Sequence, residues 1–268
     1  MTRLARPALL ALLLGLTSLT AHAGRSCDNK PPSAVSVQRS MDLAQRTAQW
    51  LDASGAQVVV LARAGQNLSR YGLRYSHLGF AYREAAAGGA GLPSVWRVVH
   101  KLNQCGTAHG ALYRQGLGEF FLDDLYEYEA AAAVLAPEVQ AALIDTLRDN
   151  RRIATLHTPA YNMLAYPWAQ SYQQSNQWAI ETLALSLDSS AATRERAQAW
   201  LKLKGYEPTT LQLSAFTRLG ARATQAHIAF DDHPNHKRFS DRIETVTVDS
   251  VFAWLSRSNL GAAPIAIR

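Results

Sequence analysis

Apolar residues recur at the spacing of a helix face in several stretches of the chain. In the first stretch, residues 36–54, five of them share one side of a helix: Val37, Met41, Ala44, Ala48 and Leu51. Apolar positions three and four residues apart form a single stripe, which a folded helix buries. The same pattern predicts further helices at 137–149, 176–187, 194–204 and 250–255.

Short apolar or alternating runs predict strands between these helices. They occur at 58–61, 75–82, 95–102, 153–156, 226–230 and 243–248. The glycine-rich stretch 88–91 reads as a turn that joins the second and third runs into a hairpin, and 63–70 reads as a polar connection. Helices and strands mix without a regular βαβ rhythm, so we predict the α+β class, with an antiparallel sheet packed against helices.

The N-terminus has the pattern of a secretory signal peptide. Arg3 and Arg6 precede an apolar run at 8–19, and Ala21-His22-Ala23 offers the small residues that signal peptidase accepts. We therefore expect residues 1–23 to be removed by cleavage after Ala23, and the protein to work in the periplasm or outside the cell. The alternative is an uncleaved anchor helix, although the run is shorter than the ~20 apolar residues of a membrane span.

Residues 24–268 suit one α+β domain, in which 206–268 is either part of the core or a C-terminal extension. No other stretch is apolar enough to span a membrane, so we expect no transmembrane anchor after cleavage. The full chain has 27 basic and 21 acidic side chains, and loss of two arginines with the signal peptide leaves a net charge of +4. This small, scattered excess argues against nucleic-acid binding.

Two cysteines, Cys27 and Cys105, remain after the predicted cleavage. An isolated pair in an oxidising compartment is most simply one disulfide. The alternative is a reactive thiol at Cys105.

Three residues offer the parts of a nucleophilic site. His77 lies on a predicted strand, where it shares a face with Gly79, and His100 lies on the partner strand of the same hairpin. Ser175 stands at the start of a predicted helix, beside unpaired backbone N–H groups. A nucleophile, a base and a residue that orients the base are the arrangement of covalent acyl transfer. Each residue also has an ordinary reading: Ser175 as a helix cap, His77 as a half-buried strand residue and His100 as a surface one.

The order of these residues resembles the circularly permuted papain-like fold of the NlpC/P60 superfamily, which includes lecithin retinol acyltransferase-type enzymes. Ser-His-Leu-Gly-Phe at 76–80 is similar to the strand that carries the base in that superfamily. Ser-Asn-Gln-Trp-Ala at 175–179 is similar to its nucleophile motif, a cysteine followed three residues later by an aromatic residue. The resemblance implies a papain-like architecture, in which Ser175 is either a serine nucleophile or the relic of a lost site.

Over most of its length the chain resembles a family of secreted bacterial proteins, domain of unknown function 2145. This resemblance implies export and a shared fold but no reaction. The residues that carry it are 72–77, 96–100, 102–106, 120–124, 175–178 and 230–234.

Two polar clusters are open to more than one interpretation. Asp231-Asp232-His233-Pro234-Asn235-His236 has the residue types of a metal site, but adjacent loop residues rarely point at one ion, so a solvated loop is the favoured reading. Asp123, Asp124, Glu127 and Glu129 read as a solvated acidic face with a minor chance of substrate contact. No phosphate-binding or dinucleotide motif is present, and we predict neither a cofactor nor a metal.

Two functions remain open, one enzymatic and one not. In the first, an amidase, peptidase or acyl transferase uses Ser175 as nucleophile, His77 as base and His100 to orient His77. Its substrate, an envelope peptide or acylated lipid, would contact Tyr75, Asn176, Gln177 and Trp178. In the second, a non-catalytic module binds an envelope peptide, glycan, lipid or protein, as the uncharged polar residues around Ser175 suggest. A metal-dependent hydrolase built on 231–236 is a third alternative.

Overall fold

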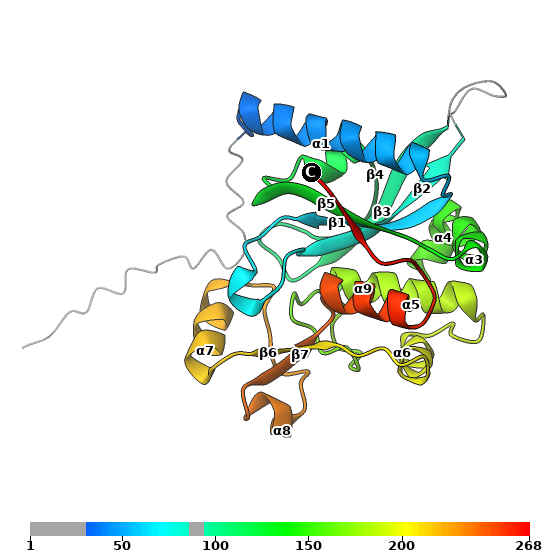
Figure 1. Ribbon diagram of the computed structural model, residues 1–268. Helices are drawn as coiled ribbons and strands as arrows, with labels where there is room; N and C mark the ends of the chain where they lie inside the picture. The colour runs from blue at the N-terminus through cyan, green and yellow to red at the C-terminus, as the bar shows by residue number, and fades with distance from the viewer. Residues whose placement is uncertain (1–30, 86–93) are drawn as a thin grey trace, which may run out of the picture.

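A six-stranded antiparallel sheet forms the centre of the molecule (Figure 1). The structure, a computed structural model, describes residues 31–85 and 94–268. The strand order is β4-β3-β2-β1-β5-β8, and every neighbouring pair is antiparallel. The strands are β1 (Val58–Ala64), β2 (His77–Glu84), β3 (Val95–Asn103), β4 (Gly110–Gly116), β5 (Glu127–Val134) and β8 (Ile265–Ile267).

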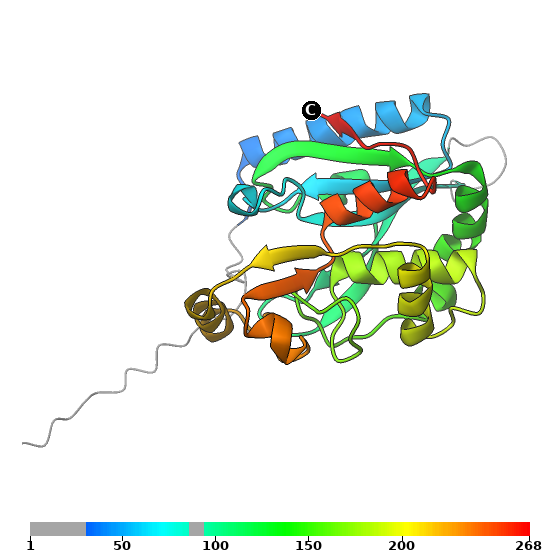
Figure 2. The ribbon, with the colours of Figure 1, turned by 60° about the horizontal axis from the view of Figure 1, so that its bottom comes forward.

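Helices cover both faces of this sheet (Figures 1 and 2). One face packs against α1 (Ala34–Ala53) and the short α2 (Leu117–Phe121). The opposite face packs against α3 (Pro137–Arg148), α5 (Ser175–Leu187) and α9 (Val248–Arg257). Two further helices, α4 (Asn150–Ala154) and α6 (Arg194–Leu203), contact α3 and α5 respectively. We name the two sides the α1 face and the α5 face.

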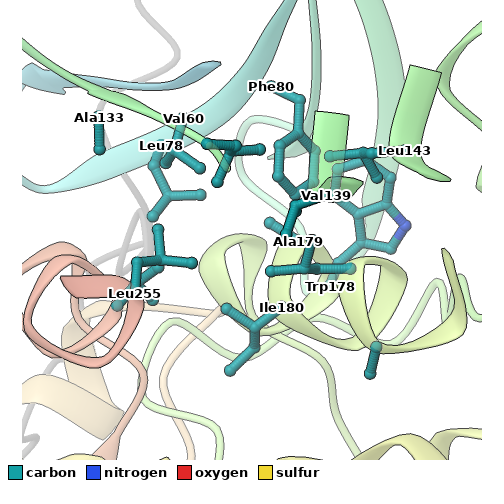
Figure 3. Packing of buried hydrophobic residues seen from close by; sticks show 14 of the residues in the cluster. Val60, Leu78, Phe80, Ala133, Val139, Leu143, Trp178, Ala179, Ile180 and Leu255 are labelled. Carbon is teal, nitrogen blue, oxygen red and sulfur yellow. The ribbon is translucent and has the colours of Figure 1, made fainter. Parts of the chain in front are cut away.

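The side-chain alternation of the strands divides the core between the two faces. In β2, Leu78 and Phe80 belong to the cluster on the α5 face, where Figure 3 shows Phe80 beside Trp178 of α5 and Leu78 beside Val60. Ala81 belongs to the cluster on the α1 face, together with Phe120 of α2. Successive residues of a strand point to opposite faces, so every residue of β2 and β3 can be assigned to one side.

A smaller sheet lies beside the α5 face. It consists of β6 (Thr209–Gln212) and β7 (Arg242–Thr245), with α7 (Ala215–Thr224) and α8 (Asn235–Arg238) nearby (Figure 2). A single 3-10 turn, η1 (Ser69–Tyr71), connects β1 to β2. The segment 206–268 also returns to the main core, because α9 lies in the α5-face cluster and β8 pairs with β5.

The structure confirms most of the predicted elements. The antiparallel α+β class is confirmed, as are the hairpin of β2 and β3 and the helices now seen as α1, α3, α5, α6 and α9. The turn predicted at 88–91, the signal peptide 1–23 and Cys27 lie outside the described residues. Among the helices that the structure describes, none has the length and apolar character needed to cross a bilayer.

Three local predictions are wrong. Residues 153–156 do not form a strand: Asp149 caps α4 by accepting from the backbone N–H of Arg151, at 2.7 Å, and Ile153 is buried from that helix. Residues 226–230 form a turn and coil instead of a strand. Arg63 belongs to β1 and is buried, so the polar connection begins after Ala64.

Candidate functional site

His77 and His100 are in direct contact, as the predicted hairpin requires. Nε2 of His77 lies 2.8 Å from Nδ1 of His100, and Nε2 of His100 lies 2.8 Å from Oε1 of Gln115 on β4. Because an amide oxygen only accepts, His100 donates from Nε2 and accepts at Nδ1 when it is neutral. His77 therefore donates from Nε2, and the lone pair of its ring remains on Nδ1. The three residues form one hydrogen-bonded chain across β2, β3 and β4.

This chain lies on the α1 face of the sheet. Val98 and Ala81 pack toward α1 and α2. Alternate residues of a strand point to the same face, so His100 has the orientation of Val98 and His77 that of Ala81. The ring of Phe120 in α2 covers the pair, with its centroid 6.0 Å from that of His77 and 5.2 Å from that of His100. Both histidines are buried, and His100 is 0% exposed.

Burial holds both imidazoles neutral. Desolvation is the main cause, and the nearby Arg63 guanidinium adds to it, so that the pKa of His100 falls to about 3. The same two causes, followed by the effect of His100 itself, lower the pKa of His77 well below its usual value. Gly79 allows His100 of β3 to lie close to β2, because a Cβ at position 79 would be only 2.9 Å from Cβ of His100.

Ser175 belongs to the other face. It is the first residue of α5, after the N-cap Gln174, and its Oγ lies 3.3 Å from the hydroxyl of Tyr161. Ser175 is 5% exposed, and Tyr161 is buried with it. The neighbouring Asn176 accepts from the backbone N–H of Leu78 at 3.1 Å and donates to the carbonyl of Val246. The helix start is thus anchored to β2 by Asn176, while Ser175 contacts Tyr161.

The structure brings His77 and His100 together but does not bring Ser175 to them. The imidazoles have the strand orientation of the residues that pack on the α1 face, whereas Ser175 is the first residue of α5, which packs on the α5 face. The hydroxyl of Ser175 has Tyr161, not His77, as its hydrogen-bond partner. A serine depends on its base for nucleophilicity, and this arrangement does not supply that contact.

The residues expected around a substrate are packing residues in the structure. Trp178 is 0% exposed, lies in the α5-face cluster and donates from its indole to the carbonyl of Ile153 at 3.1 Å. Gln177 is buried and donates to the carbonyl of Pro167 at 3.2 Å. Tyr75 is half-buried, and its hydroxyl donates to Glu129 at 2.5 Å. With Asn176 bonded as above, all four side chains are engaged within the protein.

A buried charged network on the α5 face was not predicted from the sequence. Lys101 of β3 is 0% exposed and donates to three oxygens: the carbonyl of Thr158 at 2.6 Å, the carbonyl of Gln173 at 3.0 Å and Oε1 of Gln173 at 2.9 Å. Glu181 of α5 accepts from Gln173 at 2.6 Å and from Arg194 of α6 at 2.9 Å. Three acceptors satisfy all three hydrogens of an ammonium. Burial, and then Arg194, lower the pKa of Lys101 to about 7.

This network joins the loop 155–174 to α5 and α6. Arg194 is paired with Glu181, and the ammonium of Lys101 is held by carbonyl and amide oxygens, so its buried donors have acceptors although Lys101 has no carboxylate partner. One sequence signal was available: Glu181 interrupts the apolar face of a helix in which Ile180, Leu183 and Ala184 are buried. Nothing along the chain indicates that Lys101 and Arg194 come to the same place.

The acidic cluster 123–129 is only in part the solvated face that the sequence predicted, because Asp124 is exposed and the Glu127 side chain is 44% exposed, but Glu129 is not. Glu129 is buried and accepts from Tyr75, from Arg74 at 2.7 Å and from Arg268 at 2.6 Å. Burial opposes its ionisation, but these hydrogen bonds outweigh it and lower the pKa of Glu129. Asp123 pairs with the buried Arg63. These carboxylates have structural partners.

The cluster 231–236 also has a structural role. The side chains of Asp232 and His233 are both 0% exposed, and their carboxylate oxygen and Nδ1 lie 3.0 Å apart. Nε2 of His233 lies 2.9 Å from the carbonyl of Glu244, and Asp232 accepts from the backbone N–H of Tyr166 at 2.8 Å. The pair therefore ties this loop to β7 and to the segment before α5, whereas we predicted a solvated loop. Among the described residues, no group of three or more His, Cys, Asp and Glu is arranged to hold a metal ion.

Cys105 lies in the exposed turn after β3. Its predicted disulfide partner, Cys27, is outside the described residues, so the pairing stays a prediction.

Comparison with known proteins yields one match. No curated protein and no solved structure matches the chain. One family model does match, over residues 50–255 of the 268, a span that begins near the end of α1 and reaches into α9. It includes the histidine pair, Ser175 and the buried charged network. The chain therefore belongs to the bacterial family described as an uncharacterized protein conserved in bacteria (DUF2145).

Proposed function

We propose that this protein is an exported, non-catalytic binding module of the cell envelope, in which a papain-like arrangement of elements has become a structural scaffold. The proposal of export follows from the charged, apolar and small-residue segments of 1–23. The proposal that the module is non-catalytic depends on one observation. The hydroxyl of Ser175 pairs with Tyr161 on the α5 face, while the imidazoles of His77 and His100 are paired under Phe120 on the α1 face.

Three further features support a binding function over a hydrolytic one. The ring of His77 is buried and its pKa is lowered well below neutrality by desolvation, whereas an effective general base titrates near the working pH. The residues of the nucleophile-like motif, 175–178, are all buried and bonded within the protein. The buried polar side chains of Lys101 and Glu181 have hydrogen-bond partners within the protein.

A serine hydrolase of papain-like architecture is the competing proposal. It is favoured by the contact between His77 and His100, which has the form expected of a base and the residue that orients it. For this enzyme to work, α5 would have to present Ser175 to Nδ1 of His77, which requires its N-terminus to move relative to β2. The hydrogen bond from Leu78 to Asn176 opposes that movement.

Labelling with a fluorophosphonate probe distinguishes the two proposals. A buried hydroxyl without a base does not react, so we expect the intact mass of the full chain to show no adduct under conditions that label a serine protease completely. Ser175→Ala and the exposed-site control Ser190→Ala are expected to match the wild-type protein. Stoichiometric labelling that disappears in Ser175→Ala and persists in Ser190→Ala would replace the binding proposal with the enzymatic one.

A further inference from the structure

The outer edge of the main sheet is a strand with unpaired backbone groups. β4 is the outermost strand on its side, and it pairs with β3 from Gly110 to Gly116. At its beginning the backbone N–H of Gly110 turns away from β3 and donates to the carbonyl of Pro159 at 2.8 Å. Backbone groups in an antiparallel ladder alternate between the two sides of a strand. Leu112 and Arg114 therefore also turn their N–H and C=O groups away from β3.

Nothing in the described part of the chain pairs with these four groups. The segment 158–161 covers only the first residues of β4, through Gly110 and an isolated bridge between His109 and Ala160. Leu112 and Arg114 have no backbone partner on the outer side among the described residues. An open edge of this kind accepts an added strand unless something blocks it.

A pocket follows the same edge. Its volume is about 510 Å³, and it lies between β4 and α4, lined by Ala111–Arg114, Asn150, Ile153, Ala154 and His157. Four of these eight residues are apolar: Ala111, Leu112, Ile153 and Ala154. Arg114 does not fill the pocket as a free charge, because its guanidinium is held by Asn150 at 2.8 Å and by Tyr82. A strand paired with β4 would place alternate side chains on this side of the sheet.

The surroundings of the pocket are basic. Arg151 and Arg152 lie between the pocket residues Asn150 and Ile153 in α4. Both are exposed, and neither has an ion pair within the part of the chain that the structure describes. No acidic residue lines the pocket. The charge next to the edge thus favours a ligand with a carboxylate.

We propose that β4 binds an extended peptide, which adds a strand to the sheet between β4 and α4. The backbone of the peptide pairs with Leu112 and Arg114, an apolar side chain enters the pocket, and an adjacent acidic residue faces Arg151 and Arg152. Strand addition of this type takes its affinity from backbone hydrogen bonds and its specificity from pockets for alternate side chains. This inference rests on the proposed binding function and names the class of its partner.

The experiment begins with a library of short linear peptides displayed on phage and selected on the full chain. Peptides are counter-selected against Ala154→Trp, in which an exposed alanine at the end of α4 is replaced by a side chain that fills the pocket. The matched control is Ala199→Trp, at an exposed position of α6 away from the pocket. We expect peptides that alternate apolar and other residues and include an acid. Their binding should weaken about tenfold or more in Ala154→Trp and be unchanged in Ala199→Trp.

Two measurements test strand pairing itself. N-methylation of the peptide at one set of alternate residues removes the N–H groups that pair with β4 and should weaken binding about tenfold, while methylation of the other set should have little effect. Hydrogen exchange of the wild-type protein should slow on peptide addition at the amides of Leu112 and Arg114.

Several outcomes would overturn the inference: no peptide that discriminates between the two tryptophan variants, equal effects of the two methylation patterns, or no added protection at Leu112 and Arg114. The result is separable from the proposed function. Labelling of Ser175 would disprove the non-catalytic module and leave strand pairing intact, whereas failure of strand pairing would leave Ser175 unlabelled.

Discussion

Replacing Glu181 with alanine is expected to lower the free energy of unfolding by about 3–5 kcal/mol, the usual cost of breaking a buried ion pair by removing one partner. Glu181 is 0% exposed and accepts hydrogen bonds from Gln173, Arg194 and Gln198. Without it, the buried guanidinium of Arg194 loses its counter-charge. Gln173 also loses an acceptor, and the same residue holds Lys101 in place.

Chemical denaturation of wild type and Glu181→Ala measures this loss. The matched control is Glu195→Ala, which removes an exposed carboxylate from the first turn of α6 and should change the free energy by no more than about 0.5 kcal/mol. A loss below about 1 kcal/mol in Glu181→Ala would mean that the network around Lys101 does not support the fold as described.

Lowering the pH from about 7 to about 5 is expected to reduce the free energy of unfolding by about 2 kcal/mol through His100 alone. The pKa of His100 is about 3 in the folded protein because its ring is desolvated, and it returns to an ordinary value near 6.5 on unfolding. At a pH between these two pKa values, His100 therefore binds a proton in the unfolded chain but not in the folded one. The contribution of His100 to the free energy of unfolding is fully present above the pKa of the unfolded state. It decreases by about 1.4 kcal/mol for each pH unit as the pH falls toward the pKa of the folded state.

Other histidines contribute in the same direction, so the effect must be assigned by variants. His77 is buried beside His100, and the pKa of the half-buried His157 is lowered to about 4 by desolvation and by Lys101. Denaturation at the two pH values should show a smaller difference in His100→Asn than in wild type, and the exposed His109→Gln should leave it unchanged. An equal pH difference in His100→Asn and wild type would contradict the buried, neutral state of His100.

The hairpin and the contact between its histidines could be predicted because they follow from local pattern. Alternation in β2 and β3 and a glycine at position 79 were enough to bring His77 to His100. The face to which the pair points could not be predicted. Both faces of this sheet are buried, so apolar residues occur on both faces of its strands. Leu78 packs against α5 and Ala81 toward α1, but the sequence pattern does not distinguish the two faces. The histidine pair points to the α1 face, whereas Ser175 begins a helix of the α5 face and bonds Tyr161.

Other features were missed for different physical reasons. β5 contains four consecutive alanines, which favour helix formation, but it is held as a strand between β1 and β8. β4 contains Arg114, Gln115 and three further half-buried residues, so it has little apolar alternation to reveal it. The polar networks at Lys101 and Glu129 join residues far apart in the chain, and only the folded topology brings their charges together.

The most direct test of the account is the protonation of His77, measured by the ¹⁵N shifts of its ring between about pH 5 and pH 8 in wild type and in Ser175→Ala. If the sheet separates His77 from Ser175, its ring stays neutral with the proton on Nε2 over this range, and its shifts are the same in both proteins. A ring that titrates near neutral pH, and whose pKa or shifts change when the hydroxyl of Ser175 is removed, would show that the two groups meet and would contradict the account.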